Sequence, residues 1–284
     1  MSKSKSTVAF EKMHGSGNDF IVMDARGSHF PMPEIVERTP LLCHRRTGIG
    51  ADGILFLEDS DSCDYTMHYL NADGSEAGMC GNGARCLALF AVQLGFPEQL
   101  TFQVHDKKYR AEVHPDYISV HFPVYPEPLE RKINGIDWCD LNTGTEHVVS
   151  IEEYHAATSD DMFRKTGRAI RNRADLFPSG TNVNFAHLIH ENRLKLVTYE
   201  RGVEDLTLAC GTGAIATAIA WEYRKNRKLS TVTPVQSEHH IQVDCPGGPL
   251  EVTFDVHRHH NNQRYQNITL HGPAVSVFKG TFPL

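Results

Sequence analysis

The sequence lacks any apolar run of the roughly 18 residues that a helix needs to cross a bilayer. Its first residues, MSKSKST, also lack the apolar segment of a secretory signal peptide. Both absences predict a cytoplasmic protein with no membrane as partner.

Positive charge is scarce relative to negative charge. The 284 residues include 28 Lys and Arg against 35 Asp and Glu, which gives a formal net charge of −7. This balance disfavours binding to phosphate backbones or anionic lipid. We therefore expect a small molecule and no nucleic acid as partner, and the length favours two domains over one.

Cofactor and metal signals are missing as well. The seven cysteines are an odd number without the short paired spacings of a zinc site or a disulfide-stapled domain, so we expect reduced thiols, most of them in the core. GIGADG at residues 48–53 matches a dinucleotide fingerprint as a string, but a predicted strand at 54–57 follows it where that motif needs a helix. His257, His259 and His260 lie in a polar run typical of a solvated hairpin. We predict no cofactor and no metal.

A repeated phrase is the most informative feature that is present. Cys80-Gly-Asn-Gly-Ala and Cys210-Gly-Thr-Gly-Ala each open an apolar stretch with helical spacing. The first N–H groups of a helix can hold an anion, and the helix dipole favours a thiolate at that end. A single such cysteine is more often a small buried hydrophobic residue. Its repetition favours two reactive thiols.

The predicted elements fall into two similar halves. The first half contains a strand-turn-strand, a helix, two strands, the first cysteine phrase with its helix, and a meander, at residues 8–24, 33–43, 54–57, 65–70, 84–94 and 100–122. The second half repeats the order at 146–151, 159–172, 182–189, 194–200 and 214–227, with further strands near 241–243 and 250–254. Three prolines within 122–128 favour a linker. The simplest interpretation is a duplicated α+β unit.

Two further side chains in the second half of the chain are candidates for the site. Arg201 follows a predicted strand nine residues before Cys210, and a guanidinium matches a carboxylate with two hydrogen bonds. His147 lies in the Gly-Thr-Glu-His run that corresponds to the glycine-rich turn of the first half, where a neutral imidazole could relay a proton. A surface ion pair for Arg201 and a buried core position for His147 are the alternatives.

The motifs together resemble those of the diaminopimelate epimerases, amino-acid epimerases that use no pyridoxal phosphate. The resemblance runs from about residue 10 to 280 and rests on KMHGSGNDF, GIGADG, NADGSE, CGNGAR, GTNVNF, YERGVED and CGTG, with PGG and GPA near the end. It implies an α/β (α+β type) fold of two pseudo-symmetric lobes, each a mostly antiparallel sheet wrapped around a central helix. The lobes are expected at 8–123, with 269–284 returning to it, and at 124–268, with the active site in the cleft between them.

The resemblance also implies roles for individual residues. Cys80 and Cys210 would be the acid/base thiols in the epimerisation of LL- to meso-diaminopimelate, a step in lysine and peptidoglycan precursor biosynthesis. His147 and Glu200 would support the thiols, and a homodimer is implied. The substrate would be bound by the following set: Asn18, Asn71, Gly81, Asn82, Asn182, Glu200, Arg201, Gly211 and Thr212.

The chain departs from the family pattern at a few positions. Thr145 and Glu146 precede His147 where members often have Asn-Pro or Ser-Pro, Gly53 replaces a glutamine of some members, and Leu206 replaces a frequent glutamate. These changes bear on substrate choice more than on reaction type. A racemase of another amino acid and an inert amino-acid-binding homologue remain alternatives, while a thiol-disulfide oxidoreductase is disfavoured because neither cysteine lies in a C-x-x-C motif.

Overall fold

The computed structural model describes residues 7–151, 158–227, 231–260 and 262–284, so most of the MSKSKST segment lies outside the described residues. The described chain divides into two compact units. One unit runs up to Val120 and includes Gly272–Leu284, and the other spans His121–His271. The boundaries expected from the sequence differ from these by three residues at each crossing.

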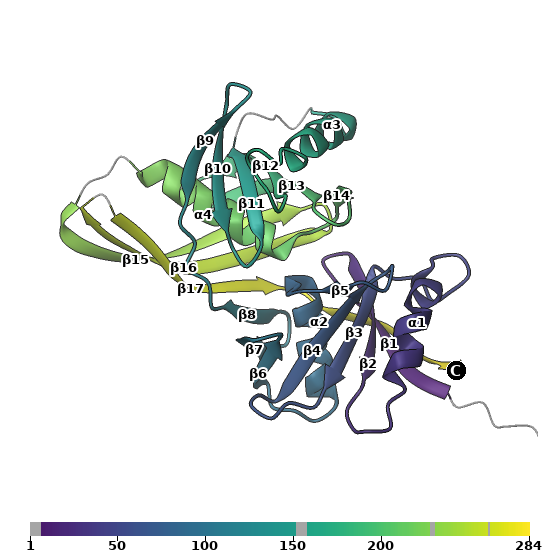
Figure 1. Cartoon of the computed structure of the whole chain (residues 1–284). Helices are drawn as coiled ribbons and strands as arrows, with labels where there is room; N and C mark the ends of the chain where they lie inside the picture. Colours follow the sequence, from purple (N-terminus) through teal and green to yellow (C-terminus); the bar gives the residue numbers. More distant parts are fainter. Residues whose placement is uncertain (1–6, 152–157, 228–230, 261) are drawn as a thin grey trace, which may run out of the picture. The chain divides into compact units, whose positions relative to one another are not determined.

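The first unit is a sheet with one helix on each face (Figure 1). Along the sheet the strands follow the order β18, β1, β2, β3, β4, β6, β7, and only the β2–β3 and β4–β6 pairs are parallel. Its elements are β1 (Thr7–Gly15), β2 (Asn18–Asp24), α1 (Met32–Cys43), β3 (Gly53–Glu58), β4 (Tyr65–Asn71), β5 (Glu76–Ala77), α2 (Gly81–Gln93), β6 (Gln99–Val104), β7 (Lys107–Val113) and β18 (Val275–Pro283), with β8 (Ile118–Phe122) leading into the second unit.

Alternation along β3 explains how the sheet buries both faces. Ile54 and Phe56 belong to the apolar cluster that includes Ile35 of α1, whereas Leu55 lies against Gly83 of α2. Successive strand side chains point to opposite faces, so α1 and α2 cover opposite sides of the sheet. α2 is buried along most of its length and forms the centre of this unit.

The second unit repeats this topology. Antiparallel β10–β11, parallel β11–β12, antiparallel β12–β13 and parallel β13–β15 correspond to β1–β2, β2–β3, β3–β4 and β4–β6. The elements are β9 (Leu129–Ile133), β10 (Ile136–Asn142), β11 (Glu146–Ile151), α3 (Asp160–Arg171), β12 (Asn182–His190), β13 (Arg193–Glu200), β14 (Asp205–Thr207), α4 (Gly211–Asn226), β15 (Thr231–Cys245), β16 (Gly248–His260) and β17 (Asn262–Gly272). The predicted duplication is confirmed.

The helices of the second unit take the places of their counterparts. α4 is buried from Gly211 to Ala220 and contacts β10 to β13, β15 and β16, as expected of a central helix. α3 packs Phe163 and Ile170 against Phe185 and Tyr199. Ser159 caps α3, because its side chain accepts a hydrogen bond from the Met162 N–H.

Several strands are longer than predicted or were not predicted. β9 and β10 follow the proline-rich segment, and β15 and β16 extend well beyond the predicted 241–243 and 250–254. The outer parts of β15 and β16 alternate polar residues with few apolar ones, so the hydrophobic pattern that marks a half-buried strand is weak there. His257, His259 and His260 lie at the end of β16, next to the start of β17, as the predicted hairpin requires.

Candidate active site

Each cysteine phrase forms the N-terminus of the central helix of its unit. Cys80 and Cys210 are the N-cap residues, with extended backbones at φ −118° and −120°. Both helices therefore begin at the glycine after the cysteine, three residues earlier than predicted at residues 84 and 214. The glycines belong to the first helical turn, where N–H groups have no intrahelical partner.

Cys80 lies against polar groups of its own unit. The Gly83 N–H donates to Cys80 Sγ at 3.4 Å, and Cys80 Sγ donates to Asn18 Oδ1 at 3.7 Å. Asn82 Nδ2 donates to the same Asn18 oxygen at 3.4 Å. The structure thus brings together three of the predicted site residues of the first unit.

A tight turn delivers Asn18 to this position. β1 and β2 are joined by Ser16 and Gly17 alone, with φ of 52° and 85°. Positive φ at both central residues is the signature of a two-residue hairpin turn, and glycine adopts it without strain. The turn places Asn18 at the first position of β2.

The Arg85 side chain holds the first turn of α2 in place through hydrogen bonds. Its side chain is fully buried and donates to Asn82 Oδ1 at 2.9 Å, to Gly81 O at 3.2 Å and to Pro273 O at 3.2 Å. A buried guanidinium with several acceptors holds backbone and side chain in one geometry. Arg85 is the last residue of the CGNGAR motif, and its role was not predicted from the sequence.

Among the described residues, the side chain of Asn71 makes no resolved hydrogen bond to this cluster. It is the last residue of β4, and its Nδ2 donates to Ser75 Oγ at 3.0 Å. Its backbone N–H also donates to Ser75 O at 2.9 Å. Asn71 therefore closes the turn after β4.

Cys210 is more buried than Cys80 and has a different neighbour. Its side chain lies 3.6 Å from Thr212 Oγ1, and the residue is 7% exposed. A Cβ at Gly213 would lie 2.6 Å from Asn184 Oδ1 and 3.3 Å from Cys210 Sγ. The glycine in the second phrase is required by this close approach.

His147 is held neutral in the second unit. Burial, followed by the charge of Arg201, lowers the pKa of His147 to about 3. Its Nε2 lies 3.0 Å from the hydroxyls of both Thr145 and Thr212. Thr212 in turn neighbours Cys210, so a chain of hydrogen-bonding groups connects the imidazole to the second thiol.

Asn184 sets the tautomer of this imidazole and was not predicted. Thr198 Oγ1 donates to Asn184 Oδ1 at 3.0 Å, so the amide presents Nδ2 to His147 Nδ1 at 3.1 Å. The hydrogen-bond network then makes Nδ1 the acceptor and assigns the ring proton to Nε2. Asn184 stands two residues after Asn182 in the GTNVNF motif, and the strand period of two was the signal that could have found it.

Asn182 and Arg201 are joined at the ends of neighbouring strands. The Arg201 N–H donates to Asn182 Oδ1 at 2.9 Å, and Asn182 Nδ2 donates to Glu146 O at 3.0 Å. Arg201 Nη1 donates to Glu146 Oε2 at 3.0 Å and to the carbonyls of Ser179 and Gly180 at 2.9 and 3.3 Å. The ion pair considered as an alternative for Arg201 is therefore present, and its partner is one of the residues that depart from the family pattern.

Glu200 closes β13 and pairs with Asp205 across the β13–β14 ladder. Its carbonyl accepts a hydrogen bond from the Glu204 N–H at 2.8 Å. The residue is half-buried, next to Arg201 in the chain.

The remaining thiols include three that are poor acid/base candidates. Burial raises the pKa of Cys43 and of Cys139 to about 12, and it also raises the pKa of Cys86. All three are buried, as predicted for core cysteines.

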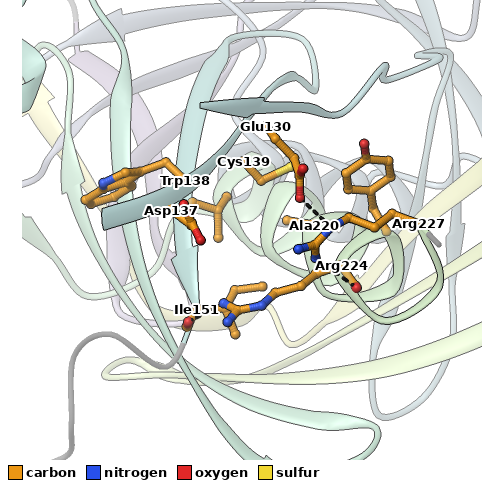
Figure 2. A pocket seen from close by; sticks show the side chains of 10 residues that line it. Glu130, Asp137, Trp138, Cys139, Ile151, Ala220, Arg224 and Arg227 are labelled. Atoms are coloured by element: carbon orange, nitrogen blue, oxygen red, sulfur yellow. Dashed lines mark hydrogen bonds and ion pairs between the residues drawn. The ribbon is translucent and has the colours of Figure 1, made fainter. Parts of the chain in front are cut away.

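A small pocket in the second unit has none of the predicted site residues in its lining; Figure 2 shows the side chains that line it. Its charged lining groups are satisfied by the protein, because Arg227 pairs with Glu130 and Arg224 donates to Ile151 O. Arg224 and Arg227 stand at the C-terminal end of α4, opposite the end that carries Cys210. The described residues contain no group of three or more His, Cys, Asp or Glu arranged to hold a metal, and none of their helices meets the length and apolarity needed to span a membrane.

Comparison with known proteins gives a consistent result. A family model described as diaminopimelate epimerase matches residues 10–116 and 140–275. The diaminopimelate epimerase of Flavobacterium psychrophilum is 38% identical over 275 residues, covering 95% of this chain and 98% of that protein. The one from Chlorobaculum tepidum is 37% identical over 279 residues, covering 96% and 100%.

Solved structures share the fold at low sequence identity. A hydroxyproline epimerase from Agrobacterium vitis aligns with a TM-score of 0.70 at 12% identity, covering 100% of this chain and 93% of that one. A phenazine biosynthesis protein of the PhzF family from Bacillus anthracis aligns with a TM-score of 0.67 at 13% identity, covering 98% and 100%. The α/β fold predicted from the sequence is confirmed.

Proposed function

The chain belongs to the diaminopimelate epimerase family and is an isomerase, and from this premise we propose that it interconverts LL- and meso-diaminopimelate without a cofactor. The observation that carries the proposal is the pairing of family membership with two cysteines at equivalent helix N-caps. The reaction would serve lysine and peptidoglycan precursor biosynthesis.

Epimerisation needs two acid/base groups, because a proton leaves one face of Cα and another arrives on the opposite face. We assign these roles to Cys80 and Cys210. One cysteine acts as thiolate and takes the Cα proton, while the other acts as thiol and donates its proton to the carbanion. After one turnover their protonation states are exchanged, and the reverse reaction restores them.

The carbanion needs stabilisation of the charge that develops next to the α-carboxylate. The first helical turns after the two cysteines offer N–H donors at Gly81, Asn82, Gly211 and Thr212, and helix dipoles favour an anion there. In a water-excluded site a single well-placed donor is worth about 2.7–4 kcal/mol. Two helix N-termini therefore supply a substantial part of the stabilisation that a cofactor would otherwise provide.

Arg201 is the candidate reader of the distal carboxylate of the substrate. The side-chain hydrogen bonds that the described chain gives Arg201 all use Nη1. That arrangement orients the guanidinium so that the edge formed by Nε and Nη2 would receive the substrate carboxylate with two parallel hydrogen bonds. Asn182, bonded to the Arg201 backbone, and Glu200 complete the distal set, together with Asn71. Asn18 belongs to the residues near the thiols that would act on the substrate Cα.

Deuterium exchange tests reaction and substrate together. Purified protein in deuterated water with LL-diaminopimelate is expected to incorporate deuterium at Cα and to form the meso isomer. Cys80→Ser and Cys210→Ser should each lower kcat by at least about 100-fold, in the range of a lost general acid or base. Cys63→Ser, at a half-buried thiol outside the site, is the matched control and should retain activity. Wild-type rates in both site variants would refute the two-thiol mechanism.

A racemase of another amino acid is the second candidate, favoured by the Glu146–Arg201 ion pair. The Glu146 carboxylate beside Arg201 would change which substrate group Arg201 binds. The same exchange assay over a panel of amino acids decides: exchange with another amino acid and none with LL-diaminopimelate would support the second candidate. Exchange with no amino acid at all would support an inert binding protein. Size-exclusion chromatography with light scattering tests the homodimer that belongs to the same proposal.

A further inference from the structure

The GIGADG motif leads into strand β3 and not into the helix that a dinucleotide site needs, and its Asp52 contacts Asn18, the hydrogen-bond partner of Cys80. Gly53 opens β3, which pairs in parallel with β2 so that Phe20 lies opposite Gly53. This register puts Asp52 beside the start of β2. The Asp52 N–H donates to Asp19 O at 2.9 Å, which fixes the Asp52 backbone to that strand.

The Asp52 carboxylate holds the amide of Asn18. Asn18 Nδ2 donates to Asp52 Oδ2 at 2.6 Å, and the Asp19 N–H donates to the same oxygen at 3.2 Å. A carboxylate only accepts hydrogen bonds, so the NH₂ end of the Asn18 amide must face Asp52. The carbonyl end then faces the other way, toward Cys80, as the 3.7 Å contact shows.

An amide carbonyl beside a cysteine favours one protonation state of the sulfur. A thiol can donate its S–H to Oδ1, whereas a thiolate gains nothing from an acceptor and is repelled by it. The same amide turned by 180° would present N–H donors and favour the thiolate. The orientation of Asn18 thus opposes the effect of the helix N-terminus on Cys80.

The charges around Asp52 largely cancel. Arg45 pairs with both Asp52 and Asp19, at 2.5 and 2.8 Å, and Lys12 pairs with Asp19. Two cations thus face two carboxylates in the cluster formed by β1, β2 and the loop before β3. A further cation, the buried guanidinium of Arg85, donates to Gly81 O in the first turn of α2. Asp52 therefore acts on Cys80 through the Asn18 amide more than through its own charge.

We propose that Asp52 is a positioning residue that orients Asn18 and thereby holds Cys80 in its protonated form in the resting enzyme. This inference rests on the proposed function for the role of Cys80. It gives the GIGADG motif a task in the acid/base cycle: it sets which of the two thiols starts as the acid.

The test is the pH dependence of Cys80 alkylation by iodoacetamide, followed on the Cys80 peptide by mass spectrometry. Asp52→Ala removes the acceptor for Asn18, and Asp19→Ala is the matched control because it removes the same charge from the same cluster. We expect the alkylation midpoint of Cys80 to fall by roughly 0.5 pH unit more in Asp52→Ala than in Asp19→Ala, about a threefold gain in thiolate below the midpoint. Equal shifts in the two variants would overturn the proposal.

A double-mutant cycle shows whether Asp52 acts through Asn18. Asn18→Ala alone should also lower the Cys80 midpoint, and in that background Asp52→Ala and Asp19→Ala should give equal shifts. An unchanged midpoint in Asn18→Ala would overturn the proposal even if the Asp52 variant fails to fold. Circular dichroism checks that each variant is folded.

Alkylation needs no substrate, so this test and the substrate assignment fail independently. If the enzyme exchanges deuterium only with another amino acid, the Cys80 midpoints still decide the role of Asp52. With LL-diaminopimelate as substrate, the pH profile of kcat/KM should shift in Asp52→Ala in the same direction as the alkylation midpoint, and a profile identical to that of Asp19→Ala would contradict the role assigned to Asp52.

Discussion

Glu146 Oε2 lies 3.0 Å from Arg201 Nη1, so the residue that stands in place of a frequent family proline is the ion-pair partner of the proposed carboxylate reader. The two side chains are 41% and 28% exposed. An exposed pair of this kind contributes only about 0–1 kcal/mol to stability. Under the proposed function its main consequence would be electrostatic, because a fixed negative charge would meet the distal carboxylate of the substrate.

Glu146→Gln should lower KM for LL-diaminopimelate about threefold, the equivalent of ~0.6 kcal/mol. The amide keeps an oxygen for Arg201 Nη1 but removes the repelling charge, so kcat and the melting temperature should change little. Steady-state kinetics at low salt and at 1 M NaCl measure the effect, which should shrink at high salt because a Debye length of about 3 Å screens it. Glu191→Gln, in the exposed pair with Lys225 at the far end of α4, is the control. A raised KM in Glu146→Gln would mean that the carboxylate instead holds Arg201 in its productive orientation.

Thr212→Val should lower kcat about tenfold and raise the pH midpoint for alkylation of Cys210. The hydroxyl stands between His147 Nε2 and Cys210 Sγ, and valine keeps its shape without a hydrogen bond. Thr217→Val on the same helix is a matched control, because the Thr217 hydroxyl is buried without a hydrogen-bond partner among the described residues. That control should raise the unfolding free energy by about 1 kcal/mol, the cost of a buried unsatisfied hydroxyl. Equal activity in the two variants would show that the Thr212 hydroxyl has no role in proton transfer by Cys210.

His147 should make the enzyme lose stability in mild acid. Its folded pKa, about 3, lies below the unfolded value of 6.5, so the unfolded chain binds the proton more readily between these values. The stabilisation is complete above pH 6.5 and falls by up to about 1.4 kcal/mol per pH unit as the pH drops toward 3. Urea unfolding at pH 7 and pH 5 should show a smaller loss in His147→Gln than in the wild type.

His68 provides a contrast of opposite sign. The hydrogen bond with Glu58 raises its pKa, so its contribution is complete below pH 6.5 and is lost as the pH rises through the raised value. Protonation of His68 beside Glu58 should therefore raise the free energy of unfolding of the wild type on mild acidification. His68→Gln should remove this contribution. If His147→Gln and His68→Gln changed the pH dependence of the free energy of unfolding in the same direction, the two opposite pKa shifts would be contradicted.

Gly213→Ala should destabilise the second unit by about 2 kcal/mol, within the range for overpacking a filled core. The new methyl group would displace Asn184 Oδ1, which accepts from Thr198 and orients the amide toward His147. Activity should fall together with the melting temperature. Gly78→Ala, where a Cβ meets nothing within 4 Å, is the stability control, and an equal change in the two variants would argue against the crowding at Gly213.

The sequence was sufficient to place the parts of the candidate site that depend on local structure. Cys80 and Cys210 were predicted at helix starts because Gly-x-Gly and the apolar spacing after it are local signals. The duplication followed from the order of the elements. Even the misplaced helix starts, three residues late, arose because glycine was interpreted as turn when the cysteine before it caps the helix.

The contacts that depend on strand register were beyond the sequence. Asp52 reaches Asn18 only because β2 and β3 pair in parallel, and Glu146 reaches Arg201 from a different strand. A one-residue change of register would turn these side chains to the opposite face. Asn184 lay in a recognised motif, yet its role as the orienter of His147 needed three strands in place.

β18 pairs with β1 along most of its length, from Thr7 opposite Pro283 to His14 opposite Val275. During synthesis the first unit is therefore made almost entirely before its last strand exists. Until β18 emerges, β1 presents an open edge, and Phe10 lacks the rings of Phe278 and Phe282 against which it packs. The second unit, continuous in the chain, can fold while the first still waits for its closing strand. The unit that carries Cys80 therefore acquires its closing strand only after the whole second unit has been synthesised.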